Sequence, residues 1–584
     1  MKKSIIILLF IILVGAFLRF YNLDWGNGYF FHPDERNIIF AALNIDFLKG
    51  DLNPNFFAYG AFPIYILRLL GGSEFESIAI TGRLVSAFLS TLSIPMMYII
   101  TKEILKKDIE NRELWALATA FLMTFSPGLI QFAHFLTFET FLYFQYILFL
   151  LFSIRIYKHE KLIDYIMIAF VIATSISTKI ISIYLIPIYF ICHILTTYKS
   201  TKEIKIHIRF FRNLLNNKFI LSLCFLVLTT FVFSAYNFLD YINFKNSMDY
   251  ETNVATGNLL VFYTQQFLET TPFIYQITRI FPYILGVPLI LLGFFAIIYL
   301  CIKSFNNFRK ILIEKKFSVD FGILILLLII FGYGTFHMWM WVKWTRYMIP
   351  LLPFLILSIT IALAYIFSYF DKKYRRSRIL NFSKILMFIL LFVPSTIQGV
   401  NFFSYYLEPD SRVVSAQWAK NNLPEDSKIL TENYDIGITA WHRYFTYEQI
   451  EEFDFYELDN DTTNQQEETL KRLLDETNYI VIASDRVFPT RFRLAEKYPK
   501  SKQFYTELFD GSLGYKLIQG FSRKTIFEKI SKPDPSFNHY LSTNNFTRYD
   551  ETLKVFDRPT VLIFEKIIQE TTSGTYLEDI DYEK

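Results

Sequence analysis

The 584-residue chain is poor in charge, in cysteine and in internal repetition. Charged residues make up 19% of it, whereas soluble domains carry about 25%. The net charge is only +4, which argues against a nucleic-acid-binding protein. The three cysteines lie in or beside apolar runs and show no metal-ligand spacing, so we expect no disulfide framework. They are Cys192, Cys224 and Cys301.

Hydrophobic residues, 53% of the chain, gather in long runs instead. A membrane core about 30 Å thick needs about 20 such residues in a helix. About eleven runs are candidates by this measure, so we expect a polytopic α-helical membrane protein. They are residues 4–20, 77–101, 113–127, 132–156, 162–176, 179–198, 218–237, 277–302, 319–337, 346–370 and 380–401. We interpret the first as a retained span, because no clear cleavage site follows it.

Lysine and arginine are concentrated in alternate loops, which predicts the orientation of the spans. With the N-terminus inside, the basic loops all face the cytoplasm, including 371–378. The segments 21–76 and 238–276 then form long outside loops, and the chain after 401 lies outside. We expect a plasma-membrane protein with an extracytoplasmic C-terminus.

The last part of the chain, 402–584, loses the long apolar runs and has the pattern of a compact α/β domain. Two domains are therefore expected, a transmembrane domain over 1–401 and a soluble extracytoplasmic domain over 402–584. The patterns predict helices over 412–422 and 465–475, and strands over 428–431, 479–483, 515–519 and 561–564.

The most distinctive local motif is His32-Pro33-Asp34-Glu35-Arg36, just after the first span. An acidic pair at a membrane surface offers a general base or a metal ligand. Asp34 is also a good N-cap for a following helix, and Glu35 suits its first turn. Both interpretations can hold together, because a capped helix would fix the carboxylate in place.

Further charged residues interrupt apolar runs near their predicted outer ends, where charge is costly and often functional. Lys179 can bind a lipid phosphate or extend to the interface. Glu139 needs a cationic partner, either Arg83 in a structural ion pair or a catalytic cation. Arg346 follows tryptophans typical of a membrane interface and can bind phosphate with a bidentate fork.

Taken in order, these motifs resemble the C-type glycosyltransferases, which include protein O-mannosyltransferases and the aminoarabinose transferase of lipid A. The matching motifs are Pro33-Asp34-Glu35, then Ser126-Pro127 with His134 and Glu139, then Thr178-Lys179 with Pro187, and Arg346-Tyr347 with Pro350 and Pro353.

The resemblance implies an inverting transfer of sugar from a polyprenyl-phosphate donor to a protein, lipid or glycan acceptor outside the cytoplasm. It implies Asp34 as the catalytic base with Glu35 orienting the site, and Lys179 and Arg346 as ligands of the donor phosphate. Further candidates for lining the site or the acceptor side are His134, Glu139, Tyr263, Gln265, Gln266, His337 and Tyr347. Family members differ in metal use, so a divalent cation stays open as a cofactor.

The main alternative is a transporter or flippase for lipid-linked sugars. Such a protein would more often show a repeat between halves and broken helices at mid-membrane. The sequence shows neither. A receptor is a further alternative, but its short inside loops leave little room for a signalling part.

Overall fold

A computed structural model describes residues 2–200, 216–314, 319–374, 377–434, 437–526 and 549–567. They form two compact units that do not follow chain order. The first unit contains residues 1–410 and 523–558, and the second contains 411–522 and 559–584. The chain therefore enters the second unit after Asp410, returns to the first at Arg523 and leaves it again after Arg558.

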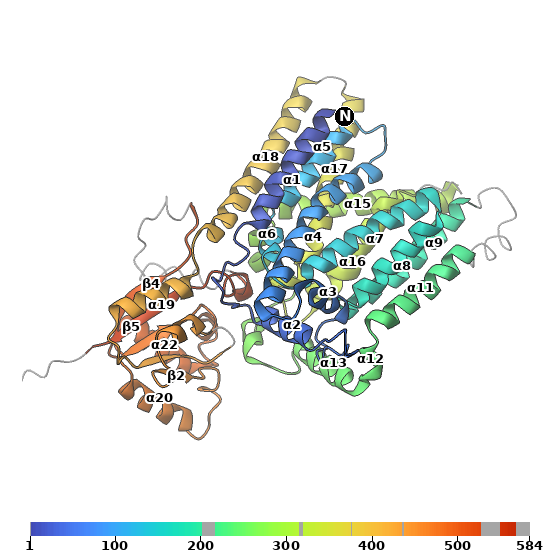
Figure 1. The fold of residues 1–584 in the computed structure, drawn as a ribbon. Coiled ribbons are helices and arrows are strands. Elements are labelled where there is room, and N and C mark those ends of the chain that lie inside the picture. Colours follow the sequence, from blue (N-terminus) through green and yellow to red (C-terminus); the bar gives the residue numbers. More distant parts are fainter. Residues whose placement is uncertain are drawn as a thin grey trace, which may run out of the picture. The chain divides into compact units, whose positions relative to one another are not determined.

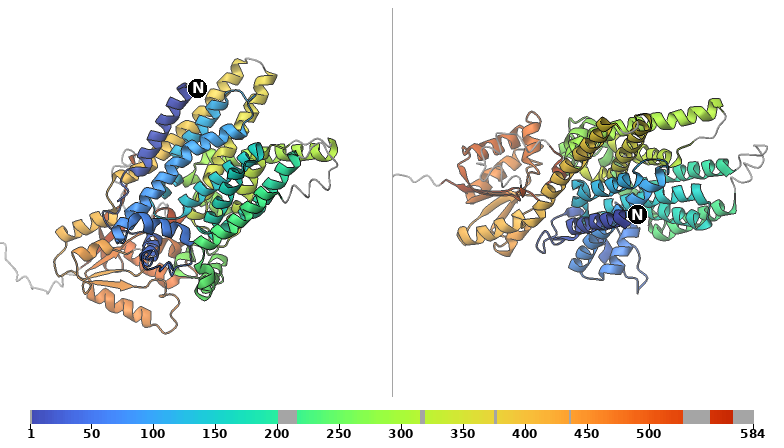
Figure 2. Two further views of the ribbon diagram at one scale, coloured as in Figure 1. Left: turned by 45° about the vertical axis from the view of Figure 1, so that its right-hand side comes forward. Right: turned by 90° about the horizontal axis from the view of Figure 1, so that it is seen from above.

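Long apolar helices build the first unit and pack in two groups (Figures 1 and 2). One group contains α1 (Lys2–Phe20), α4 (Phe75–Ile104), α5 (Arg112–Phe125), α17 (Leu352–Lys373) and α18 (Arg378–Phe403). The other contains α7 (Glu139–His159), α8 (Leu162–Ile176), α9 (Leu185–Ser200), α11 (Asn217–Phe233) and α16 (Phe321–Trp339). The helix α15 (Val287–Glu314) packs on α17.

Each of the predicted apolar runs overlaps one of these helices. Among the described residues, eight helices are long and apolar enough to cross a membrane, and nine if the bent pair α5 and α6 (Pro127–Ala133) counts as one. The helices α8 and α11 are apolar but shorter. The chain is thus a multi-pass membrane protein, while a total of eleven crossings and the side of the N-terminus stay predictions.

The two long loops expected outside are folded rather than extended. The first contains α2 (Pro33–Leu43) and α3 (Ala61–Gly71), and the second contains α12 (Tyr236–Leu239), α13 (Tyr241–Thr256) and η2 (Phe262–Phe267). The helices α2 and α3 share a buried hydrophobic core with α4 and the start of α7, including Ile38, Ile64 and Phe138. All four α-helices of these loops lie at the end of the unit away from the N-terminus (Figure 1).

The second unit contains a five-stranded sheet in the order β2-β1-β3-β5-β4. The strands are β1 (Ile429–Glu432), β2 (Ile450–Phe453), β3 (Tyr479–Ile482), β4 (Tyr515–Phe521) and β5 (Val561–Lys566). The strands β2, β1 and β3 run parallel, and β5 is antiparallel to β3 and β4. The helices include α19 (Ser411–Asn422), α20 (Gln465–Glu476) and α22 (Pro499–Asp510). The predicted sheet is confirmed, with β2 as an additional strand.

Candidate active site

The helix α2 presents Asp34 in its first turn, but Asp34 is not the N-cap. His32 takes that position, and its Nδ1 accepts a hydrogen bond from the Asp34 backbone N–H at 3.2 Å. Pro33 occupies the first helical position, where its missing N–H costs nothing. The N-cap prediction is therefore wrong, and its failure leaves the Asp34 carboxylate available for contacts outside the helix.

The Asp34 carboxylate forms an ion pair with Arg346, and the two side chains are each 23% exposed. The same guanidinium nitrogen donates a hydrogen bond to the Tyr59 hydroxyl at 2.9 Å. Burial alone would raise the pKa of Asp34, but the charge and hydrogen bond of Arg346, together with the charge of Lys179, outweigh it and hold that pKa below its usual value. Asp34 is therefore ionised at neutral pH.

The Glu35 carboxylate points elsewhere and is fully buried. It forms two hydrogen bonds with Arg83, at 2.6 and 3.1 Å, and accepts a third from the backbone N–H of Leu136 at 2.7 Å. Arg83 also donates to the carbonyl of Leu23 at 2.7 Å. These bonds join α2 to α4 and to the segment that precedes α7, and they place Glu35 in the buried packing of the first loop.

Lys179 lies between α8 and η1 (Ile180–Tyr184), at the end where these segments meet the first loop. Its ammonium is 3.9 Å from the Glu139 carboxylate and 4.5 Å from the centre of the Tyr347 ring. Glu139 is buried, and neither of its oxygens has a hydrogen-bond partner among the described residues. The cation expected beside Glu139 is thus Lys179 rather than Arg83.

A close backbone approach fixes Lys179 beside Tyr59. The Gly60 N–H donates to the carbonyl of Thr178 at 3.0 Å, and the Phe62 N–H donates to that of Ser177 at 3.0 Å. A Cβ atom on Gly60 would lie 2.1 Å from the Ser177 carbonyl oxygen, so only glycine fits there.

A cavity of about 1130 Å³ opens beside these residues. Its walls are mainly apolar and include Phe244, Met248 and Trp339, while Lys179, Glu251 and Tyr59 supply polar groups. His337 and Tyr347, two of the predicted lining residues, also border it. Burial raises the pKa of Glu251, although Arg346 and Lys179 act in the opposite direction.

The remaining candidates from the second loop lie in η2. The Tyr263 hydroxyl is 2.9 Å from that of Tyr250. Gln266 accepts hydrogen bonds from the Tyr275 hydroxyl and the Glu551 backbone, each at 3.1 Å, and so belongs to the packing of this loop. Gln265 lies beside it in the same turn.

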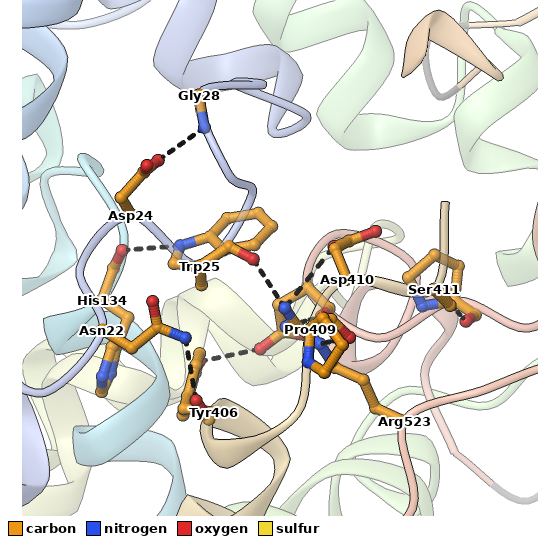
Figure 3. Close-up of polar contacts among 12 residues, drawn as sticks. Asn22, Asp24, Trp25, Gly28, His134, Tyr406, Pro409, Asp410, Ser411 and Arg523 are labelled. Carbon is orange, nitrogen blue, oxygen red and sulfur yellow. Dashed lines mark hydrogen bonds and ion pairs between the residues drawn. The ribbon is translucent and has the colours of Figure 1, made fainter. Parts of the chain in front are cut away.

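His134 is not among the residues that line the cavity and lies beside the start of the first outside loop, near Trp25 (Figure 3). Its carbonyl accepts a hydrogen bond from the Trp25 indole at 3.1 Å. The Trp25 carbonyl in turn accepts from Arg523 at 2.6 Å, and Arg523 also binds the Pro409 carbonyl at 3.1 Å and lies 3.8 Å from Asp410. The chain leaves the first unit after Asp410 and returns to it at Arg523. Arg523 thus joins these two points of the chain to each other and to Trp25 in the first outside loop (Figure 3).

Among the described residues, no three His, Cys, Asp or Glu side chains gather in a way that would hold a metal ion. Asp34 is engaged by Arg346, Glu35 by Arg83, and Glu139 and Glu251 belong to other elements. The site as it stands does not fit a metal, and no step below depends on one.

Comparisons with known proteins agree with this architecture. The model of the dolichyl-phosphate-mannose-protein mannosyltransferase family matches residues 62–215. The apo oligosaccharyltransferase of Archaeoglobus fulgidus is 12% identical with a TM-score of 0.51, over 96% of this chain and 88% of that one. Its complex tethered to an acceptor peptide with an NVT sequon is 13% identical with a TM-score of 0.50, over 97% and 88%.

ArnT from Cupriavidus metallidurans, bound to undecaprenyl phosphate, is 13% identical with a TM-score of 0.40, over 84% of this chain and 94% of that one. A comparison with curated proteins finds no match. The chain thus combines a partial match to the mannosyltransferase model with the fold of an archaeal oligosaccharyltransferase, which confirms the resemblance to C-type glycosyltransferases indicated by the sequence.

Proposed function

We propose that this protein is an inverting membrane glycosyltransferase that moves a sugar from a polyprenyl-phosphate donor to an acceptor at the outer face of the plasma membrane. The observation that carries the proposal is the ion pair of Asp34 with Arg346, with Lys179 nearby at the wall of a large apolar cavity. A base, two cations and an apolar chamber are the groups that this reaction needs.

The donor combines an apolar chain with an anionic head, and the site offers surroundings for both. The apolar walls around Met248, Phe244 and Trp339 suit the polyprenyl chain. Lys179 and Arg346 would hold the phosphate, because both are cations beside Tyr347 and a guanidinium matches phosphate geometry. Glu139 balances the charge of Lys179 before the donor binds.

In the proposed reaction, the acceptor hydroxyl attacks the anomeric carbon from the face opposite the phosphate. Asp34 takes the hydroxyl proton, the new carbon–oxygen bond forms, and the bond between the anomeric carbon and the phosphate oxygen breaks. The polyprenyl phosphate leaves with the bonding electrons, and Lys179 and Arg346 stabilise its growing charge. The anomeric configuration inverts because only one displacement takes place.

The ion pair also supplies a way to tune the base. Arg346 lowers the pKa of Asp34 while the two are paired, whereas burial works to raise it. A donor phosphate that binds Arg346 would weaken this pair and leave burial as the larger influence. Asp34 would then become a stronger base in the donor complex than in the free protein, as general-base catalysis near neutral pH requires.

The acceptor is a protein, a lipid or a glycan. The Archaeoglobus fulgidus enzyme was crystallised with an acceptor peptide, so peptides are the first class to test. Tyr263, Gln265 and Gln266 remain candidates for the acceptor side. Gln266 would act there through the packing of η2.

The test is a transfer assay with purified protein, labelled polyprenyl-phosphate sugars and a panel of acceptors, followed by determination of the product anomer. The proposal predicts a glycosylated product whose anomeric configuration is opposite to that of the donor. A product with retained configuration would contradict the single-displacement mechanism. Transport of a lipid-linked sugar across vesicles with no transfer to any acceptor would favour the flippase instead.

A further inference from the structure

The candidate site is contacted by a segment from far along the sequence, residues 549–558, which we call the return segment. It belongs to the first unit, although the chain passes through four strands of the second unit before reaching it. We propose that the return segment positions Asp34 and Arg346 against each other, with Asp550 as the positioning residue for Arg346. This inference rests on the proposed function of that pair.

Asp550 is fully buried and binds the residue that precedes Arg346. Its Oδ2 accepts hydrogen bonds from the backbone N–H of Thr345 at 3.0 Å and from the Thr345 hydroxyl at 2.7 Å. Its Oδ1 accepts from the Tyr275 hydroxyl at 3.3 Å. Thr345 and Arg346 lie in the same short turn, η4 (Thr345–Tyr347). The hydrogen bonds that hold the Thr345 backbone therefore also orient the Arg346 side chain.

The other end of the return segment reaches the Asp34 side of the pair. The Phe556 ring stacks on the His32 imidazole, with ring centres 4.0 Å apart and planes at 28°. His32 is the N-cap of α2, and its Nδ1 accepts the N–H of Asp34. The return segment therefore contacts Thr345, next to Arg346, and His32, the N-cap of the helix that carries Asp34. It acts on the ion pair through these neighbours.

The return segment has its own anchors away from the site. The Gln131 amide donates to the Leu553 carbonyl at 2.9 Å, and the Tyr406 hydroxyl donates to Asp557 Oδ2 at 2.8 Å. Asp557 is also buried in the return segment, but its carboxylate accepts hydrogen bonds from Gln131 and Tyr406 rather than from Thr345 or His32. Asp557→Asn is therefore a matched control, because it weakens the attachment of the return segment without touching the neighbours of the ion pair.

The experiment compares Asp550→Asn, Thr345→Val, their double variant and Asp557→Asn in the full chain. For each, kcat and donor KM are measured per folded protein, with thermal melting as the folding control. Binding of undecaprenyl phosphate is followed by tryptophan fluorescence. Misplaced catalytic groups are costly, so we expect Asp550→Asn to lower kcat/KM roughly 10- to 100-fold and to weaken phosphate binding. Asp557→Asn should leave both unchanged per folded protein.

We further expect the double variant to be no worse than the worse single one, because both changes weaken the same contact between Asp550 and Thr345. Equal kcat, KM and phosphate affinity in Asp550→Asn and wild type would overturn the inference while leaving the proposed function intact. The inference would also be overturned if Asp550→Asn and Asp557→Asn lost the same share of kcat/KM and that loss matched their fall in melting temperature. A wild-type protein that neither binds undecaprenyl phosphate nor transfers from any such donor contradicts the proposed function, and this inference with it.

Discussion

The carboxylates of Asp34 and Glu35, neighbours in the sequence, bind different arginines in different surroundings. Asp34 pairs with Arg346, and each of these side chains is 23% exposed. Glu35 pairs with Arg83, and both of these side chains are 0% exposed. Asp34 is thus partly exposed, whereas Glu35 is part of the buried framework beside it.

The first prediction concerns Glu35. Glu35→Ala leaves the Arg83 guanidinium buried without its partner, which typically costs about 3–5 kcal/mol of stability. We expect a large fall in melting temperature and in the yield of folded protein. The double variant Glu35→Leu with Arg83→Met should recover much of the melting temperature, since no charge is then buried. Normal melting of Glu35→Ala would show that the pair is not structural.

The second prediction separates two roles of Lys179. Lys179→Met removes the proposed charged contact to the phosphate, and such contacts contribute about 1.5–3 kcal/mol, so donor KM should rise roughly 10- to 100-fold. If Lys179 served only to neutralise Glu139, the double variant with Glu139→Gln would restore KM. We expect no such recovery. Lys199→Met, which removes an exposed lysine bonded to the Tyr157 carbonyl, is the matched control and should behave as wild type.

The third prediction is a pH dependence. Arg346 holds the pKa of Asp34 below its usual value, against the effect of burial. In the proposed mechanism the carboxylate is the active form, so wild-type kcat/KM should fall only at acidic pH below that usual value. In Arg346→Gln the pKa should rise, and the acidic limb of the normalised pH profile should move to higher pH. An acidic limb at the same pH in both proteins would show that Asp34 is not the titrating base.

The fourth prediction concerns the approach of the first loop to Lys179. Gly60→Ala places a Cβ 2.1 Å from the Ser177 carbonyl, and forced packing of this kind costs about 1–3 kcal/mol. We expect lower stability together with weaker donor binding, because Lys179 must move. Gly293→Ala is the control, since its Cβ would meet only Ile359 at ordinary contact distance, 3.8 Å. Equal donor affinity in both variants would argue against this account of the Gly60 contact.

Much of the fold follows from local pattern. Apolar length marks a membrane helix without knowledge of its neighbours, which is why every predicted run overlaps a helix. The strand β2 (Ile450–Phe453) was not predicted, because two of its four residues are glutamates. They interrupt the apolar pattern of a strand, although Ile450 and Phe453 are buried. The N-cap error at Asp34 had an available signal, since Pro33 favours the first helical position and so assigns the cap to His32.

The site itself was only partly predictable. The motif around Asp34 and the isolated charges of Lys179 and Arg346 stand out because charge in or near an apolar run is costly. Tyr59, Glu251 and Asp550 carry no such signal, since each lies in a segment of ordinary polarity. Their roles depend on tertiary contacts, such as the bond of Tyr59 to Arg346 and that of Asp550 to Thr345.

The most direct test of the account compares Asp34→Asn with Asp46→Asn in the transfer assay, with both proteins shown to be folded in the membrane. Asp46 lies in the same loop and pairs with the exposed Lys49 at 3.2 Å, so its loss should be silent. Loss of a general base lowers rates by about 10²- to 10⁴-fold, and we expect a fall of this size in kcat for Asp34→Asn alone. Full activity of Asp34→Asn would contradict the assignment of the catalytic base.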